Sequence, residues 1–246
     1  MIDYNQYEFT KLEIALYAGE WLVICSVIGW LFYHSIIAII IMFLFIKMFF
    51  QDKKKLLNSK RKNELNVQFR DAISSLSSAL SAGYSIENAF AEAYDDLLLV
   101  YSKEALIIKE LYYIVRKLEM NETIETLLED LSRRSGDEDI KSFTEVFTIA
   151  KRSGGDFISI IDMTTNSISG KIDVKREIKV ILSDKKLEQR IMNMIPIMII
   201  LYVGSTSQGF FDSLYNNLFG IIIMTICLGI YGLAYLLGRK IVEVEV

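Results

Sequence analysis

The stretch at residues 218–237, LFGIIIMTICLGIYGLAYLL, contains no formal charge. A helix of about 20 residues is about 30 Å long, which matches the hydrocarbon core of a bilayer. The preceding stretch at 191–211, IMNMIPIMIILYVGSTSQGFF, is also uncharged and contains Pro196, the only proline of the chain. Membrane helices tolerate a proline where neighbouring groups satisfy the freed carbonyl. The sequence therefore predicts two membrane helices, the first kinked at Pro196, with a short polar connection at 212–217 between them.

A second hydrophobic region runs from Trp21 to Phe50 and is interrupted at His34-Ser35. One helix of about 30 residues would be about 45 Å long, which is too long for a single span without strong tilt. We therefore favour a tight hairpin with helices at about 14–33 and 36–50. The alternative is one span with a flank at the bilayer surface. Glu20 in the first helix is expected near a bilayer edge or against a partner helix.

The positive charges indicate the orientation of the chain in the membrane. Of the 27 lysines and arginines, 23 lie at residues 51–190, between the hydrophobic regions, and the outer connection at 212–217 has none. The positive-inside rule places the central region and both ends of the chain in the cytoplasm. We expect a multi-pass protein of the inner (cytoplasmic) membrane in three parts. These are a membrane hairpin at 1–50, a cytoplasmic helical domain at 51–190, and two membrane helices with a short cytoplasmic tail at 191–246.

The central region has the pattern of successive amphipathic helices, because its apolar residues recur at spacings of three and four. A last helix is expected to continue without a break into the membrane span that begins at Ile191. Together these helices predict an all-α domain with one modest core. The predicted core positions are Ile86, Ala89, Phe90, Ala93, Tyr94, Leu97, Ile107, Leu111, Ile114, Val115, Leu118, Ile124, Leu127, Leu128, Leu131, Ile140, Phe143, Val146, Phe147, Ala150, Phe157, Ile160, Ile161, Thr164 and Ile168.

Turn and cap residues separate the expected helices. Gly83 is predicted at the left-handed C′ position that ends one helix, and Ser85 as the N-cap of the next. Asn121 is predicted as another cap. Gly154-Gly155 is predicted to end a helix, and Asp156 to cap the long helix that follows.

The sequence shows no arrangement of side chains that points to catalysis. The single histidine, His34, falls at an outer turn and excludes a two-histidine zinc motif. There is no G-x-x-x-x-G-K-[ST] phosphate loop, and Cys25 and Cys227 lie in apolar stretches without metal-ligand spacing. The net charge of −4 does not suggest nucleic-acid binding. We therefore expect no enzyme activity, no catalytic residues, no cofactor, no metal and no nucleic-acid partner.

Two short motifs admit more than one interpretation. Gly154-Gly155-Asp156-Phe157 partly resembles the signature of cyclic-dinucleotide synthases and the glycine–aspartate motif of membrane aspartyl proteases. It lacks the glutamate of the first and the membrane depth of the second, so a helix stop followed by a cap explains it better. The run Asp137, Glu138 and Asp139 suits a helix start, where carboxylates gain a few tenths of a kcal/mol from the macrodipole. The alternative for this run is a docking surface for a basic partner.

The order of several motifs carries a family resemblance. Phe69-Arg70-Asp71-Ala72 leads to SAGYSI at 81–86, and Phe143-Thr144-Glu145-Val146 leads to AKRSGGDF at 150–157. A charged helix then enters the membrane helix that bears Pro196, and the chain ends in GRKIVEVEV. In this order the motifs resemble the F domain of type II secretion systems, in the branch that serves tight-adherence (Tad, Flp-type) pili.

This resemblance implies an all-α polytopic membrane protein with a cytoplasmic antiparallel helical bundle. Such a platform protein does no bond chemistry. It would bind a cytoplasmic hexameric secretion ATPase and a second related platform protein, and couple the motor to movement of pilin or pseudopilin subunits out of the lipid bilayer. The alternative function is a small transporter or channel subunit, which needs polar groups within the spans. Glu20, Asn193 and Gln208 are the candidates for that path.

Overall fold

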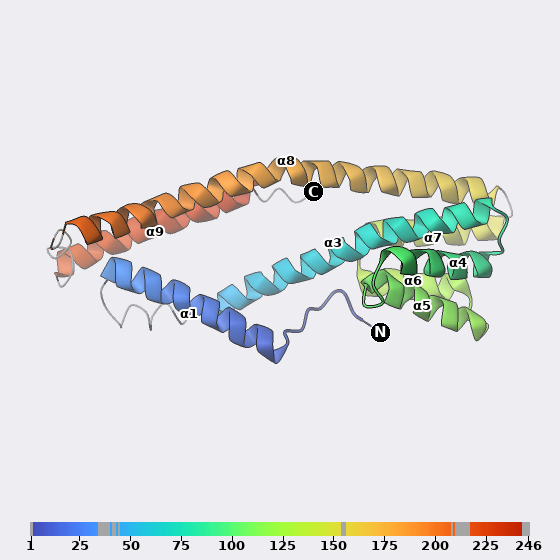
Figure 1. Ribbon diagram of the computed structural model, residues 1–246, viewed down its shortest axis with the longest axis horizontal. Helices are drawn as coiled ribbons and strands as arrows, with labels where there is room; N and C mark the ends of the chain where they lie inside the picture. Colours follow the sequence, from blue (N-terminus) through green and yellow to red (C-terminus); the bar gives the residue numbers. More distant parts are fainter. Residues whose placement is uncertain are drawn as a thin grey trace. The chain divides into compact units, whose positions relative to one another are not determined.

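All secondary structure in the described part of the chain is helical. The computed structural model describes residues 2–33, 40, 43, 45–153, 156–207, 209 and 217–242, and within them it contains eight helices and no strand (Figure 1). The all-α class expected from the sequence is confirmed. The helices are α1 (Lys11–Tyr33), α3 (Ile46–Ser81), α4 (Ile86–Val100), α5 (Leu106–Glu119), α6 (Ile124–Ser135), α7 (Glu138–Ser153), α8 (Phe157–Thr206) and α9 (Leu218–Val242).

Three of these helices, α1, α8 and α9, are long and apolar enough to cross a membrane. They indicate a multi-pass membrane protein. The second helix of the expected N-terminal hairpin, at 36–50, falls partly on residues outside the described ranges, and its described end, from Ile46, opens α3. A fourth span therefore stays a prediction.

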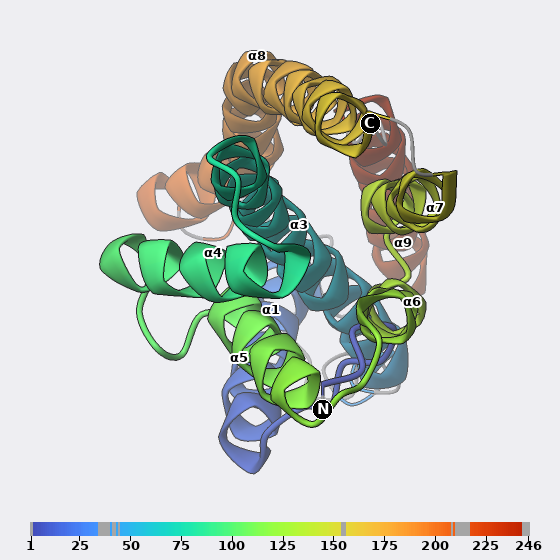
Figure 2. The ribbon, with the colours of Figure 1, turned by 90° about the vertical axis from the view of Figure 1, so that its right-hand side faces the viewer.

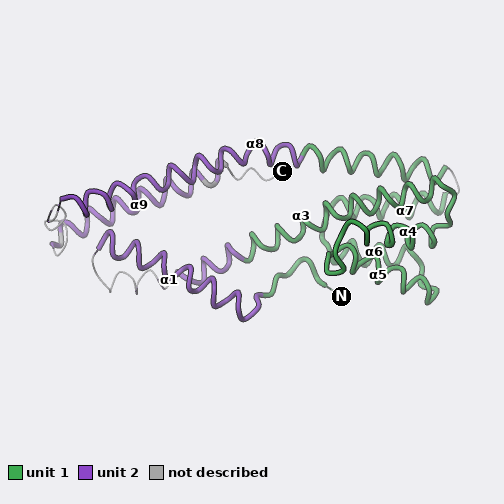
Figure 3. The backbone as a smooth tube through the Cα atoms, in the orientation of Figure 1, with its two compact units in different colours: residues 1–8, 54–174 green, residues 9–53, 175–246 purple. Residues whose placement is uncertain are grey.

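The chain divides into two compact units, which Figure 3 shows in different colours. Unit 1 comprises residues 1–8 and 54–174, and unit 2 comprises residues 9–53 and 175–246. Two of the three divisions fall inside helices, because α3 and α8 each continue from one unit into the other, and the third lies between Glu8 and Phe9. The domain limits expected at residues 50 and 190 lie within the same two helices.

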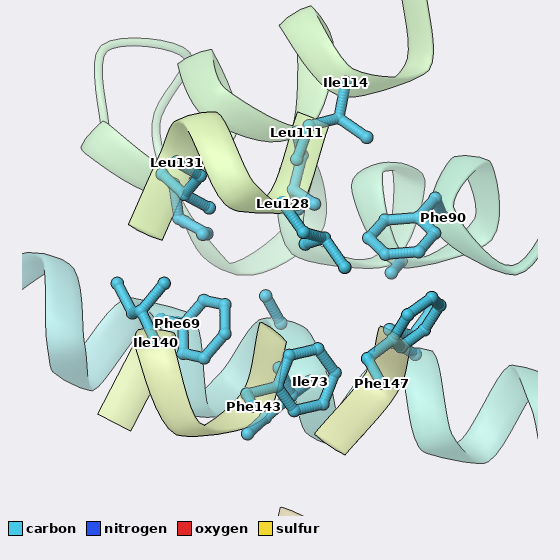
Figure 4. Packing of buried hydrophobic residues seen from close by; sticks show 14 of the residues in the cluster. Phe69, Ile73, Phe90, Leu111, Ile114, Leu128, Leu131, Ile140, Phe143 and Phe147 are labelled. Atoms are coloured by element: carbon cyan, nitrogen blue, oxygen red, sulfur yellow. The ribbon is translucent and has the colours of Figure 1, made fainter. Parts of the chain in front are cut away.

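Unit 1 is built around one hydrophobic core, to which α3 to α8 all contribute. Within it α4 packs on α5, and α6 packs on α7 (Figure 2). Figure 4 shows the aromatic centre of this core, where the ring of Phe143 lies 5.5 Å from that of Phe69 and 5.8 Å from that of Phe147. Such ring pairs contribute about 0.5–1.5 kcal/mol each beyond the area that they bury. The expected core positions on α4 to α7 that are buried are Ala89, Phe90, Ala93, Leu97, Ile107, Leu111, Ile114, Ile124, Leu127, Leu128, Leu131, Ile140, Phe143, Phe147 and Ala150.

The buried face of α8 differs from the expected one. Ile161 and Ile168 are buried as predicted, but Ile160 remains 38% exposed. The face continues instead through Thr165 and Ile172, both buried. These positions follow i, i+4, i+7 and i+11, whereas residue 160 is turned away by about 100° from residue 161.

Most of the predicted caps are present, and one is wrong. The Ser85 hydroxyl accepts a hydrogen bond from the Asn88 backbone N–H, and Asp156 accepts one from Ser159 N–H. Gly83 has the positive φ expected of a C′ glycine, +92°. Asn121 is not a cap: α6 is preceded by Thr123, and Asn121 itself has φ of 63° just after the end of α5. Asn tolerates this left-handed region better than most residues, which explains its place at a helix end.

Unit 2 contains the apolar helices. Leu31 and Phe32 of α1 pack with Met224 of α9, and a hydrogen bond of 3.0 Å joins the Tyr33 and Thr225 hydroxyl groups. Glu20, within the apolar helix α1, faces a partner helix, which was one of the two expectations for it. Both of its carboxylate oxygens accept hydrogen bonds from Lys53 Nζ of α3, at 2.9 Å each.

Candidate functional site

The acidic run at the start of α7 is mainly an internal network. Asp137 caps the helix, because its Oδ1 accepts hydrogen bonds from the backbone N–H groups of Asp139 (2.9 Å) and Ile140 (3.2 Å). The Asn66 side chain of α3 donates to the same oxygen at 2.8 Å. This arrangement matches the helix-start interpretation of the run.

The Asp139 side chain is buried and bound on two sides. Only 4% of the residue is exposed, and its carboxylate accepts hydrogen bonds from Asn66 Nδ2 (3.1 Å) and from Lys171 Nζ of α8 (2.5 Å). The hydrogen bond to Asp139 raises the pKa of Lys171, so this lysine stays charged at neutral pH. Of the three acids proposed as a docking surface, Glu138 alone is exposed.

The N-terminal segment forms a second polar network, which we call the N-terminal clasp: residues 2–8 with Arg61, Glu110 and Arg134. Tyr4 is fully buried in the core of unit 1, and its hydroxyl donates a hydrogen bond of 2.8 Å to Glu110 Oε1. The backbone N–H of Tyr4 donates to the Arg134 carbonyl at 3.0 Å. The segment is thus an integral part of unit 1, although Phe9 and the following helix α1 belong to unit 2.

The clasp contains a buried ion pair. Arg134 Nη1 and Nη2 donate to the two carboxylate oxygens of Glu110 at 2.8 and 2.6 Å, and Glu110 is 1% exposed. Arg134 Nε also donates to Asp130 at 2.6 Å. Burial alone would lower the pKa of Arg134, but the two carboxylates raise it well above its usual range. Burial and Glu110 likewise raise the pKa of Tyr4, so the phenol stays protonated as the donor.

Two basic residues of α3 bind the N-terminal segment 2–8. Arg61 Nη2 donates to the carbonyls of Asp3 (2.6 Å) and Gln6 (3.0 Å), and its guanidinium lies 5.3 Å from the ring centre of Tyr4. Lys62 Nζ donates to Asn5 Oδ1 at 2.7 Å. Residues 2–7 are therefore held by contacts from three different helices, α3, α5 and α6.

The other residues singled out from the sequence are placed apart from these networks. Gly83 lies at the turn before α4, and Pro196 lies inside α8, which continues beyond it to Thr206. Gly154, Gly155, His34 and Gln208 fall outside the described residues. Among the residues that the structure describes, no group of three or more metal-ligating side chains comes together.

Comparisons with known proteins bring no relative to this chain. No protein-family model, curated protein or solved structure matches it. The function proposed below therefore rests on the chain's own residues and on the resemblance of its motifs.

The clasp was not predicted from the sequence. Residues 2–8 are too few and too irregular to show helical periodicity, and their partners are more than 50 positions away along the chain. The one available signal is compositional: Tyr4 and Tyr7 stand in a polar segment immediately before an apolar helix.

Proposed function

We propose that this chain is an inner-membrane platform protein of a type II secretion or Tad-type (Flp) pilus machine. In this role it couples a cytoplasmic hexameric ATPase to the assembly of pilin or pseudopilin subunits, beside a second related platform protein. The observation that carries the proposal is α8, a single helix of 50 residues that begins in the core of unit 1 and ends as a candidate membrane span. A continuous helix transmits displacement along its axis, which a flexible linker does not.

The described side chains favour a binding and coupling role over chemistry. The strongly paired acids and bases of unit 1 hold helices together: Asp139 with Lys171, and Glu110 with Arg134. Each of these groups has its partners within the fold, whereas a catalytic group needs an open position for substrate. We therefore expect the purified chain to hydrolyse no ATP.

The clasp supports a four-span topology with the N-terminus in the cytoplasm. Residues 2–8 and residues 54–174 belong to one compact unit, and a compact soluble unit lies on one side of a membrane. If α1 crosses the bilayer, the chain has to recross it between Tyr33 and Lys54. The α8 and α9 spans then bring the C-terminal end back to the side of unit 1. The 23 basic residues at 51–190 assign that side to the cytoplasm.

The proposal is tested by co-purification of the full-length chain, in detergent, with a hexameric secretion ATPase of the same organism. We expect association at about 50 mM salt and weaker association at about 500 mM, because salt screens exposed charges. Glu138→Lys should weaken it, whereas Glu119→Lys, which changes an exposed glutamate at the end of α5, serves as the matched control. Asp139→Lys is unsuitable, because it would place a second cation against Lys171.

Failure to associate at low salt, with the second platform protein also present in the membrane, would remove the mechanism and favour the transporter alternative. Of the described candidates for that path, Glu20 is paired with Lys53, so an ion path through its carboxylate would require this pair to open.

A further inference from the structure

A hollow of about 450 Å³ lies on unit 1 between α3 and the C-terminal end of α4. On the α3 side it is lined by Ser74, Ser75 and Ser78, whose short side chains leave the space open. None of the residues that line it is a lysine or an arginine. The full lining is Asp71, Ser74, Ser75, Ser78, Asp96, Leu97, Leu99, Val100 and Tyr101.

The two carboxylates of the hollow differ in how they are held. Asp71 is neutralised locally, because Arg70 pairs with its Oδ1 at 2.8 Å and the Tyr101 hydroxyl donates to its Oδ2 at 2.5 Å. Asp96 is exposed, and its Oδ2 accepts a hydrogen bond of 2.6 Å from the Ser75 hydroxyl. That bond orients the Asp96 carboxylate without neutralising its charge. Asp96 therefore supplies a fixed negative charge at the hollow.

The apolar part of the lining is unusually open to solvent for a helix of this unit. Leu99 is 87% exposed and Val100 is 75% exposed, side by side at the end of α4. Tyr101 follows them and contributes a partly exposed ring. The hollow thus offers a wall of aliphatic and aromatic carbon beside an oriented carboxylate. This combination fits a long basic side chain, whose methylene stem packs on carbon while its charged head reaches an acid.

The charge of α4 extends this match beyond the hollow. The helix carries four acids and no lysine or arginine, and its other face is buried in the core through Ala89, Phe90, Ala93 and Leu97. The acids Glu87, Asp95 and Asp96 are exposed. A partner that contacts Leu99 therefore approaches a helix whose charged side chains are all acidic. Such a surface repels anionic lipid headgroups and attracts a basic segment of a protein.

We propose that this α3–α4 hollow is a docking site for a partner protein, and that it takes a lysine or arginine next to an apolar residue. The basic side chain enters beside Asp96, and the apolar residue covers Leu99 and Val100. The site is separate from the exposed Glu138 of α7, and any protein other than a second copy of this chain can carry the segment.

Photo-crosslinking in intact cells tests this site. A photoreactive amino acid is placed at Val100 of the full-length chain, and, as a control, at Ile149 of α7, which is 64% exposed but followed by the basic pair Lys151-Arg152. We expect Val100 to crosslink to a protein segment that mass spectrometry shows to contain lysine or arginine beside an apolar residue. Asp96→Lys should lower the yield by about tenfold or more, and a lysine- or arginine-to-glutamate change in the partner segment should restore it. Leu99→Ser, a change at a largely exposed side chain that lies outside the core, should also lower the yield.

Several outcomes would overturn the site. These are a yield at Val100 no higher than at Ile149, a crosslink to lipid, to a second copy of this chain or to a segment without a basic residue, or yields unchanged by both substitutions. The result also separates this site from the platform proposal. A basic segment from a protein other than the secretion ATPase would keep the hollow as a site and leave the motor without a contact here. Co-purification of the ATPase without a crosslink at Val100 would keep the platform and reject the hollow.

Discussion

Replacing Arg134 by methionine should destabilise unit 1 far more than the same change at its neighbour, Arg133. Arg134 is the buried partner of Glu110, with 12% and 1% of the two side chains exposed. Arg133 also forms an ion pair, with Asp130 at 2.7 Å, but 80% of its side chain is exposed. The two arginines share chemistry, helix and a common partner, and differ mainly in burial. Methionine preserves most of the apolar stem in both cases.

The size of the effect follows from the charge that is left behind. Removing one member of a buried ion pair costs about 3–5 kcal/mol, because the other charge loses its compensation. We expect the lower end, about 3 kcal/mol, since the Tyr4 hydroxyl continues to donate to Glu110 and Asp130 is partly solvated. At about 1.4 kcal/mol per tenfold, this corresponds to roughly a hundredfold increase in local opening. Arg133→Met should cost about 0.5 kcal/mol or less, as is typical of exposed pairs.

Hydrogen exchange of the full-length chain in detergent, resolved by mass spectrometry, measures both effects. The peptides of α5 and α6 should exchange roughly a hundred times faster in Arg134→Met and at nearly the wild-type rate in Arg133→Met. The double variant Glu110→Gln with Arg134→Met should recover much of the protection, because no buried charge remains. Equal exchange in the two single variants would refute the interpretation of Arg134 as the compensating charge of a buried acid.

Three further predictions concern the clasp, the glycines and the topology. Tyr4→Phe should lower the stability of unit 1 by about 1.5–3 kcal/mol in urea unfolding at neutral pH, because a hydrogen bond to a charged acceptor is lost. Burial and Glu110 raise the pKa of Tyr4, so the extra stability of the wild type over Tyr4→Phe is fully present below pH about 10 and falls by about 1.4 kcal/mol per pH unit above it. A stability difference that does not change with pH would contradict this assignment. A Cβ at Gly83 or at Gly170 of α8 would contact nothing within 4 Å, so only the backbone conformation decides the effect of alanine. Gly83→Ala should lower the free energy of unfolding by about 1 kcal/mol because of the positive φ at this position, and Gly170→Ala should raise it by about 1 kcal/mol because the position is helical. Urea unfolding should therefore show changes of opposite sign for the two variants. The topology is tested with single cysteines in a background without Cys25 and Cys227. A cysteine at position 217 should react with an impermeant thiol reagent in intact cells, and one at position 8 should react only after lysis. Labelling at position 8 in intact cells would refute the four-span topology.

Local sequence signals predicted the parts of this fold that depend on neighbouring residues. Ser85 and Gly83 were assigned correctly, because a cap or a positive φ is determined within one turn of the chain. Asn121 was assigned to the wrong helix end: a residue that favours the left-handed region can either start a helix or follow one. Ile160 was wrongly included in the core, because two adjacent isoleucines satisfy the same periodicity and only packing selects Ile161.

Long-range polar contacts could not be predicted in the same way. Tyr4 and Glu110 are 106 positions apart, and no periodic pattern connects an irregular segment to a helix so distant. The burial of Asp139 also depends on a contact with a distant residue, which the local sequence does not show. A run of acids suggests a solvated surface, and only the approach of Lys171 from α8 makes Asp139, the last acid of that run, an internal contact.

Continuity of α8 between unit 1 and the membrane span is the central claim, and a matched pair of insertions tests it most directly. Seven residues make about two helical turns, so a seven-residue alanine-rich insert between Ser183 and Asp184 preserves the facing of α8 to within about 20°. A glycine–serine insert of equal length interrupts the helix instead, since each glycine costs about 1 kcal/mol relative to alanine. Under the proposed platform role, the measurement is the amount of assembled surface pili at equal chain levels, with ATPase co-purification as the check on binding. We predict that both variants bind the ATPase, that the alanine-rich insert retains pili and that the glycine–serine insert loses them. Equal pilus assembly by the two variants would contradict coupling through α8.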